Sequence, residues 1–150
     1  MIKQALKGLV FTAAILGLGA TTAQAGDAEN GYNKQKVVYH INNLDSANGA
    51  LRNVKNHLNA VGDKNVDMVV VAHSKGATFM VDGTTDSKGN TFENTIAELA
   101  DRGVKFNFCA NTIRGLKIDK KMINPAVEIV PSGVAEVAHL QQQGYLYVKP

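Results

Sequence analysis

Short apolar runs alternate with amphipathic stretches along the chain, a pattern that predicts strands alternating with helices. The run VDMVVVA at 66–72 is almost entirely apolar and rich in β-branched residues, which is typical of a central strand covered on both faces. Similar runs predict further strands at 36–41, 104–109, 127–130 and 145–148.

Amphipathic segments at 45–61, 92–102 and 132–143 are predicted to be helices. The expected caps are Asp45 or Ser46, then Thr91, then Ser132. In the last helix, Val134, Val137 and Ala138 share the apolar side. Strands that alternate with helices are joined by right-handed crossovers. The sequence therefore predicts one three-layer, flavodoxin-like α/β domain whose mostly parallel sheet has about five strands.

Two segments are predicted to be loops. The stretch 73–90 is rich in Gly, Ser and Thr, and its apolar patch at 79–81 is expected to be available to a neighbouring subunit. The stretch IRGLKIDKKM at 113–122 carries four bases and one acid, which is also consistent with a solvated loop.

The first 25 residues are typical of a secretory signal peptide. Two lysines precede an apolar run from Leu9 to about Ala20, which is shorter than the roughly 20 residues of a membrane-spanning helix. The ending Ala-Gln-Ala suits cleavage after Ala25. We therefore expect export to the periplasm or the medium, a flexible segment at 26–35 and one domain at 36–150.

The charge of the chain gives no argument for a nucleic-acid or membrane partner. The sequence holds 16 basic and 13 acidic residues, but two of the lysines lie in the predicted signal peptide. The mature protein is thus nearly neutral, and no basic surface is expected.

In parallel sheets, ligands bind beyond the carboxyl ends of the strands. The residues expected there are His40, Asn42, Asn43, His73, Ser74, Lys75, Cys109, Asn111, Thr112, Pro131 and Ser132. Among them, the stretch AHSKG resembles the Gly-x-Ser-x-Gly turn of serine hydrolases. Asp101 or Asp119 and then His139 would complete the order of a triad, but His139 falls within a predicted helix and no helix clearly begins after Ser74. Ser74 is therefore predicted to be a turn residue.

Cys109 is the sole cysteine, so no internal disulfide can form. An unpaired thiol in an exported protein is either buried and inert or kept for its chemistry. Nearby bases or backbone N–H groups would activate it, and His40 and His73 would converge on it as bases or donors. Each histidine is equally consistent with a structural role. Two histidines and one cysteine without ligand spacing predict no metal site.

Five segments carry a family resemblance: KVVYHIN, NVKNHLNAV, VVVAHSKG, VKFNFCANT and VEIVPSGVAEVAHLQQQGYLYVKP. In this order they resemble the DsrE/DsrF-like family, in its exported, single-domain branch, over 36–150. The resemblance implies a compact α/β fold, homotrimers or hexamers, and a persulfide-carrying position at Cys109. Sulfur-relay members pass sulfur between cytoplasmic proteins, in sulfur oxidation or tRNA thiolation, whereas this chain is expected to be exported.

Two functions are consistent with these observations. In the first, a periplasmic protein accepts or carries sulfane sulfur on Cys109, without a cofactor, in exchange with a sulfur donor or acceptor protein or a small sulfur compound. Its pocket would be shaped by His40, Asn43, His73, Asn111, Thr112 and Ser132. In the second, a non-enzymatic oligomeric module binds a small ligand or a partner, and Cys109 serves only packing.

Overall fold

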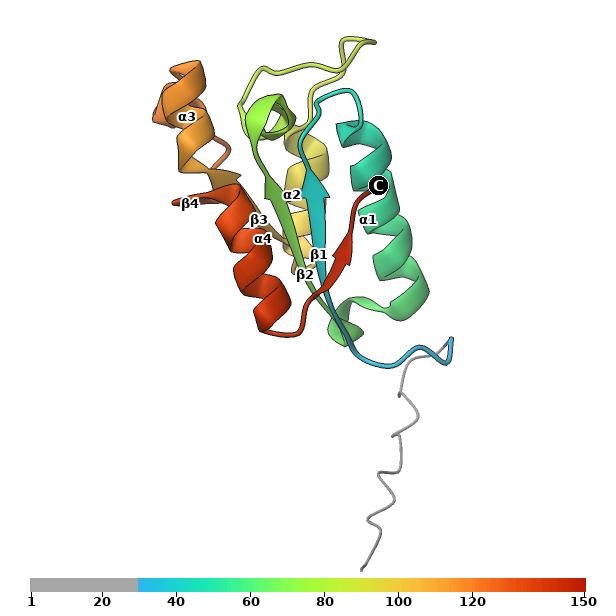
Figure 1. Ribbon diagram of the computed structural model, residues 1–150. Helices are drawn as coiled ribbons and strands as arrows, with labels where there is room; N and C mark the ends of the chain where they lie inside the picture. Colours follow the sequence, from blue (N-terminus) through green and yellow to red (C-terminus); the bar gives the residue numbers. More distant parts are fainter. Residues whose placement is uncertain (1–29) are drawn as a thin grey trace, which may run out of the picture.

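The computed structural model describes residues 30–150, so the predicted signal peptide and residues 26–29 of the segment at 26–35 lie outside the described residues. Five strands form one sheet in the order β4-β3-β2-β1-β5, and every pairing is parallel (Figure 1). The strands are β1 (Gln35–Ile41), β2 (Val66–Ala72), β3 (Lys105–Cys109), β4 (Val127–Val130) and β5 (Leu146–Val148). The predicted α/β class and parallel sheet are confirmed.

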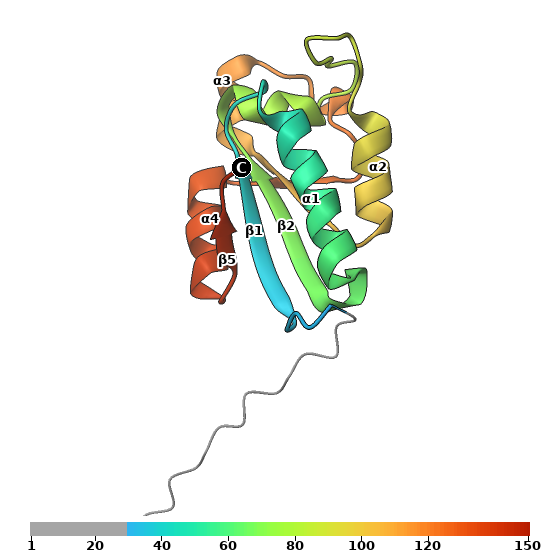
Figure 2. The same cartoon turned by 90° about the vertical axis from the view of Figure 1, so that its right-hand side faces the viewer.

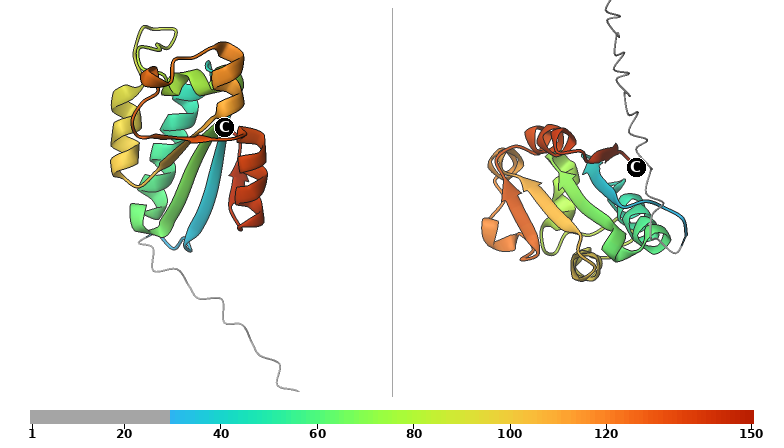
Figure 3. Two further views of the ribbon diagram at one scale, coloured as in Figure 1. Left: turned by 90° about the vertical axis from the view of Figure 1, so that its left-hand side faces the viewer. Right: turned by 90° about the horizontal axis from the view of Figure 1, so that it is seen from below.

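Four α-helices and three short 3-10 helices connect the strands. They are α1 (Ala47–Val61), η1 (Asp63–Asn65), η2 (Ser74–Met80), α2 (Glu93–Asp101), α3 (Ala110–Leu116), η3 (Lys120–Met122) and α4 (Gly133–Gln142). The helices α1 and α2 cover one face of the sheet and α4 covers the other, as Figure 2 and Figure 3 show. The molecule thus has the predicted three layers.

The alternation of side chains along the central strands assigns residues to the two faces. Towards α1 and α2, the large core contains residues such as Tyr39, Val70 and Phe106. Towards α4, a smaller core joins Val38, Val69, Val71, Val137, Leu140 and Tyr145. His40 and His73 continue the second series, so they lie at the carboxyl edge on the α4 side.

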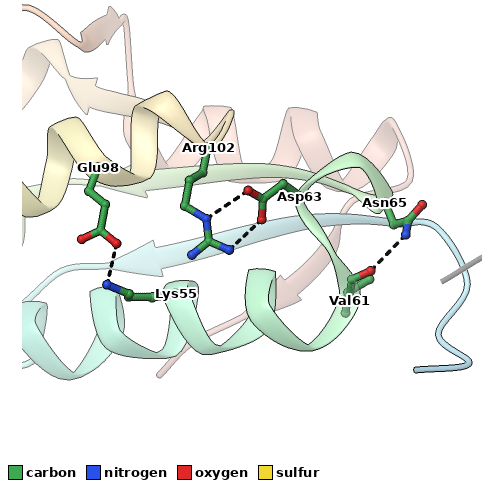
Figure 4. Close-up of polar contacts among 6 residues, drawn as sticks. All are labelled: Lys55, Val61, Asp63, Asn65, Glu98 and Arg102. Atoms are coloured by element: carbon green, nitrogen blue, oxygen red, sulfur yellow. Dashed lines mark hydrogen bonds and ion pairs between the residues drawn. The ribbon is translucent and has the colours of Figure 1, made fainter. Parts of the chain in front are cut away.

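Ion pairs join α1 and η1 to α2 (Figure 4). Lys55 Nζ lies 2.5 Å from Glu98 Oε1, and the Arg102 guanidinium donates to both Asp63 oxygens at 2.6 and 3.0 Å. Asn65 Nδ2 donates to the Val61 carbonyl at 3.0 Å, which closes the end of α1. Such exposed ion pairs usually contribute less than about 1 kcal/mol of stability. The two helices are therefore held in place mainly by the buried apolar core that they share with the sheet.

The predicted loop at 73–90 is wrong in its first half, because η2 begins directly after β2. Phe79 is only 1% exposed, and its ring packs 5.8 Å from that of Phe92. Met80 is also fully buried. Phe79 and Met80 belong to the core and are not available to a neighbouring subunit, while Val81 is partly buried and packs against that core.

Three further helical details differ from the prediction. The stretch after Cys109 is not a loop, since α3 follows β3 without an intervening turn. In α4 the buried positions are Gly133, Val137 and Leu140, whereas Val134 is 63% exposed. Ala138 is exposed as well. In addition, Phe92 rather than Thr91 occupies the cap position of α2.

Within residues 30–150, no helix combines the length and the apolar character needed to cross a bilayer.

Candidate functional site around Cys109

A pocket of about 460 Å³ opens at the carboxyl edge of the sheet, between the ends of β2 and β3 and the starts of α3 and α4. Its lining comprises His73, Ser74, Lys75, Cys109, Asn111, Thr112, Gly115, Leu116, Ser132 and Val134. The structure therefore brings together Cys109 and four of the six residues expected to shape its pocket, namely His73, Asn111, Thr112 and Ser132. Ser74 and Lys75, which were also expected at the strand ends, line the pocket with them.

Cys109 lines this pocket and is 4% exposed. Burial is the largest single influence on its thiol and raises the pKa. Hydrogen bonds from the backbone N–H groups of Gly133, Thr112 and Asn111 and from the Thr112 hydroxyl act in the opposite direction. Together they outweigh burial and bring the pKa of Cys109 below its usual value, which favours the reactive thiolate.

The local chain path explains why so many donors meet at one sulfur. Because α3 begins at Ala110, the N–H groups of Asn111 and Thr112 lie in its first turn and have no carbonyl partner within the helix. Gly133 arrives from the other side, at the start of α4. A Cβ on Gly133 would lie 3.2 Å from Cys109 Cβ and 3.1 Å from His73 Cβ, so the absence of a side chain permits this close approach.

Thr112 links the thiol to the turn after β2. Its hydroxyl donates to Cys109, and its Oγ1 accepts from the Ser74 N–H at 2.8 Å. Ser74 has a φ of 53°, in the left-handed region that non-glycine residues seldom occupy. The turn is therefore strained locally, and it brings the Ser74 backbone and side chain to the pocket.

His40 and His73 form a direct pair, with 2.7 Å between their Nε2 atoms. His73 Nδ1 lies 3.0 Å from Ser74 Oγ, and His40 Nδ1 lies 2.7 Å from Tyr147 Oη. Burial is the main cause that lowers the pKa of each histidine, and the positive charge of Lys149 lowers both further. Both rings are thus held in the neutral form near neutral pH.

Two expected residues do not reach the pocket lining. His40 touches the site only through His73. Asn43 lies in the turn between β1 and α1, where its Oδ1 accepts from the Asp45 N–H at 3.1 Å. A side chain that closes its own turn in this way is committed to local structure.

Comparisons with known proteins agree with this architecture. The sequence model of the DsrE/DsrF-like family matches residues 16–150. The chain belongs to this family. Two solved structures share the fold, each with a TM-score of 0.65 and each covering 77% of this chain and 99% of the other. One is the protein of unknown function MTH1491 from Methanobacterium thermoautotrophicum, at 29% identity, and the other is the ychN protein from E. coli, at 19% identity. A search of curated proteins finds no match.

In this DsrE/DsrF-like chain, the bases that follow Cys109 do not activate it. None of them is among the causes that lower the thiol pKa. Arg114 instead donates to the Asn111 side chain, and Lys117, Lys120 and Lys121 are exposed. Backbone N–H groups and the Thr112 hydroxyl are what lower the pKa of the Cys109 thiol, an effect that the sequence left open between nearby bases and N–H groups.

The structure also decides against a hydrolase triad. Ser74 Oγ is hydrogen-bonded to the adjacent His73, while His139 lies on the exposed side of α4 beside Gln143.

Three features of the candidate site were not predicted from the sequence: Gly133, Tyr147 and the apolar rim of Leu116 and Val134. The Pro-Ser-Gly stretch before α4 is the one signal that could have indicated Gly133, since it places a glycine at a helix start beside the pocket. Across residues 30–150, no group of three metal-ligating side chains occurs.

Proposed function

We propose that the protein is a periplasmic sulfur carrier that accepts sulfane sulfur on Cys109 and holds it as a persulfide. The observation that supports this most directly is the thiol itself, which lines an open pocket and whose pKa is lowered by the backbone N–H groups of Gly133, Thr112 and Asn111 and by the Thr112 hydroxyl. A purely structural cysteine needs none of these donors, because a buried thiol packs as a small apolar group.

The transfer step needs no oxidant or cofactor. The Cys109 thiolate attacks the outer sulfur of a donor that contains a sulfur–sulfur bond, a new S–S bond forms, and the donor's S–S bond breaks. With thiosulfate the leaving group is sulfite, and with a hydropersulfide it is a thiolate. The same N–H groups that stabilise the Cys109 thiolate can donate hydrogen bonds to the terminal sulfur anion of the persulfide.

The pocket is suited to a small donor or to the end of a partner's chain. Its volume of about 460 Å³ exceeds what a single sulfur atom requires. The rim residues Leu116 and Val134 are 46% and 63% exposed, and they present apolar surface beside the polar base of the pocket. Delivery by a donor protein is consistent with such a rim.

Export and self-association are parts of the same proposal. The predicted signal peptide supports export, and family membership supports a homotrimer or homohexamer. Light scattering at micromolar concentration tests the assembly, and a monomer would contradict it. Amino-terminal sequencing of the protein isolated from cell fractions tests cleavage after Ala25.

The function is tested by loading the purified protein with polysulfide or thiosulfate and measuring its intact mass. We expect the mass of one added sulfur, its release as thiocyanate by cyanide, and loss of both signals in Cys109→Ser. His57→Gln is the control, since His57 lies on α1 outside the pocket lining and this variant should still load. A wild-type protein that gains no sulfur, and whose folded state resists alkylation, would contradict the proposal.

The alternative, a binding module with a structural cysteine, is favoured by the low exposure of Cys109 at 4%. It predicts that Cys109→Ala keeps ligand binding and changes only stability. Measuring the mass carried by Cys109 in protein isolated directly from cells separates the two functions, because only the carrier is expected to retain extra sulfur.

A further inference from the structure

Four side chains form a continuous row of hydrogen bonds between an edge strand and the Cys109 pocket. Tyr147 Oη lies 2.7 Å from His40 Nδ1, His40 Nε2 lies 2.7 Å from His73 Nε2, and His73 Nδ1 lies 3.0 Å from Ser74 Oγ. Tyr147 is 42% exposed on β5, and Ser74, which is also exposed, lines the pocket. The row therefore joins the edge strand to the pocket by side chains alone.

With both rings neutral, this row can be satisfied in only two ways, because a neutral imidazole has one N–H and one acceptor nitrogen. Either every group donates towards the pocket, from Tyr147 to Ser74, or every group donates towards Tyr147. Moving one proton along all the bonds converts the first arrangement into the second and delivers one proton to the pocket. No other arrangement leaves all three bonds intact.

Both rings cannot be charged at once, since two Nε2–H groups would then face each other across 2.7 Å. The charged and titratable groups near the row also disfavour a stored positive charge. Lys149 acts on both histidines, and Lys75 lines the pocket beside His73. Cys109 is the group whose negative charge the pocket favours. The row is thus built to pass a proton rather than to hold one.

We propose that Tyr147, His40, His73 and Ser74 form a proton relay that protonates the leaving thiolate when a persulfide donor transfers sulfur to Cys109. This inference rests on the proposed sulfur-carrier function. Ser74 and His73 touch the pocket and act on the reacting groups, and His40 and Tyr147 are positioning residues that refill the relay from water.

The step balances without an added reactant. The Cys109 thiolate attacks the outer sulfur of R–S–SH, which gives Cys109–S–SH and RS⁻. The Ser74 hydroxyl gives its proton to RS⁻, each member of the row passes one proton inwards, and Tyr147 takes one from water. The Cys109 persulfide then loses its proton to water and remains as the anion, so that the net products are Cys109–S–S⁻ and RSH.

Thiosulfate provides an internal comparison, because it leaves as sulfite, a much weaker base than a thiolate. Its reaction at Cys109 has little need of a proton. A relay that serves leaving-group protonation should therefore matter for glutathione persulfide and not for thiosulfate, whereas damage to the shape of the pocket should affect both donors.

The test measures sulfur loading rates from both donors by rapid quench and intact mass, over a range of pH, in His40→Gln, His73→Gln and Tyr147→Phe. A glutamine amide can bond to both neighbours but cannot pass a proton. We expect His40→Gln and His73→Gln to slow loading from glutathione persulfide by about 100-fold, as for loss of general acid catalysis. Tyr147→Phe should slow it by a smaller factor and reduce the solvent deuterium isotope effect. Thiosulfate loading should be unchanged in all three.

The matched control is His57→Gln. His57 is also bonded to a tyrosine, with 3.0 Å between its Nδ1 and Tyr39 Oη, but it lies on α1 under the opposite face of the sheet. It should leave both rates unchanged. Relay variants that slow both donors equally, or neither, would overturn the relay while sulfur loading itself stands. A wild-type protein that loads from neither donor would overturn the carrier function and the relay with it.

Discussion

Replacing Thr112 by valine tests how the fold activates Cys109, because valine keeps the shape of the side chain and removes one hydroxyl. That hydroxyl donates to the thiol sulfur and accepts from the Ser74 N–H. A hydrogen bond to a charged group contributes about 1.5–3 kcal/mol. At a pH below the thiol pKa, losing this hydrogen bond would make the thiolate population roughly ten- to a hundredfold smaller.

The reactivity should fall less than the population does. A more basic thiolate is also more nucleophilic, with a Brønsted slope of about 0.5, so the alkylation rate near neutral pH should drop only about three- to tenfold. The variant should also be less stable by about 1–3 kcal/mol, because the Ser74 N–H loses its partner in a partly buried turn.

Ultraviolet titration of the thiolate measures the population, and the pH dependence of iodoacetamide alkylation measures the reactivity. Thr112→Ser is the matched control, since it keeps the hydroxyl and should titrate like the wild type. If Thr112→Val shows an unchanged thiol pKa, the backbone N–H groups alone activate Cys109, and the Thr112 hydroxyl has no part in lowering that pKa.

Three further predictions concern stability. Phe79→Ala should cost about 3–5 kcal/mol in urea unfolding, as for a fully buried aromatic ring, whereas a surface position would cost less than about 0.5 kcal/mol. Gly76→Ala should destabilise the protein by at least about 1–3 kcal/mol, because the new Cβ would lie 2.5 Å from the backbone N of Asn43. Gly89→Ala is its control: a Cβ there meets no neighbouring atom, but the φ of 82° is unfavourable for alanine, so this variant measures backbone strain alone. Burial lowers the pKa of His40, His57 and His73 below 6.5, so the unfolded state binds more protons than the folded state at mildly acidic pH. The free energy of unfolding should therefore decrease as the pH drops from about 7 to 5. An unfolding free energy that instead increases over this range would contradict the lowered histidine pKa values.

Much of the fold could be predicted because its long elements repeat their apolar residues with a clear period. The buried face of α1 (Leu51, Val54, Leu58 and Val61) and the whole of β2 follow from the sequence alone. The elements that were missed, η2 and α3, each have only seven residues. Two helical turns are too short to establish a period, so tertiary packing rather than sequence pattern determines them.

The candidate site was predictable to the extent that it follows from the ends of parallel strands. Cys109 and His73 were found in this way. The contact between His40 and Tyr147 was not, because it depends on β5 returning to pair with β1 after the chain has crossed to the far edge of the sheet. Asn43 was expected at the pocket for its position, but the sequence pattern does not show that its amide closes a local turn.

The resemblance of AHSKG to a hydrolase turn has a physical cause that does not require hydrolysis. Any chain that passes from a buried strand directly into a packed helix needs a sharp turn and small neighbours. In this protein Ala72 is fully buried, Ser74 has a φ of 53°, and Gly76 lies against the backbone of the turn between β1 and α1.

The same turn determines what Ser74 can do. Its N–H supports Thr112, and its Oγ is bonded to a histidine whose other nitrogen is already engaged by His40. A serine nucleophile needs a base that is held by an acid, and this histidine is held by a second imidazole. The geometry of this turn therefore does not support Ser74 as a nucleophile, although Ser74 and Cys109 line the same pocket.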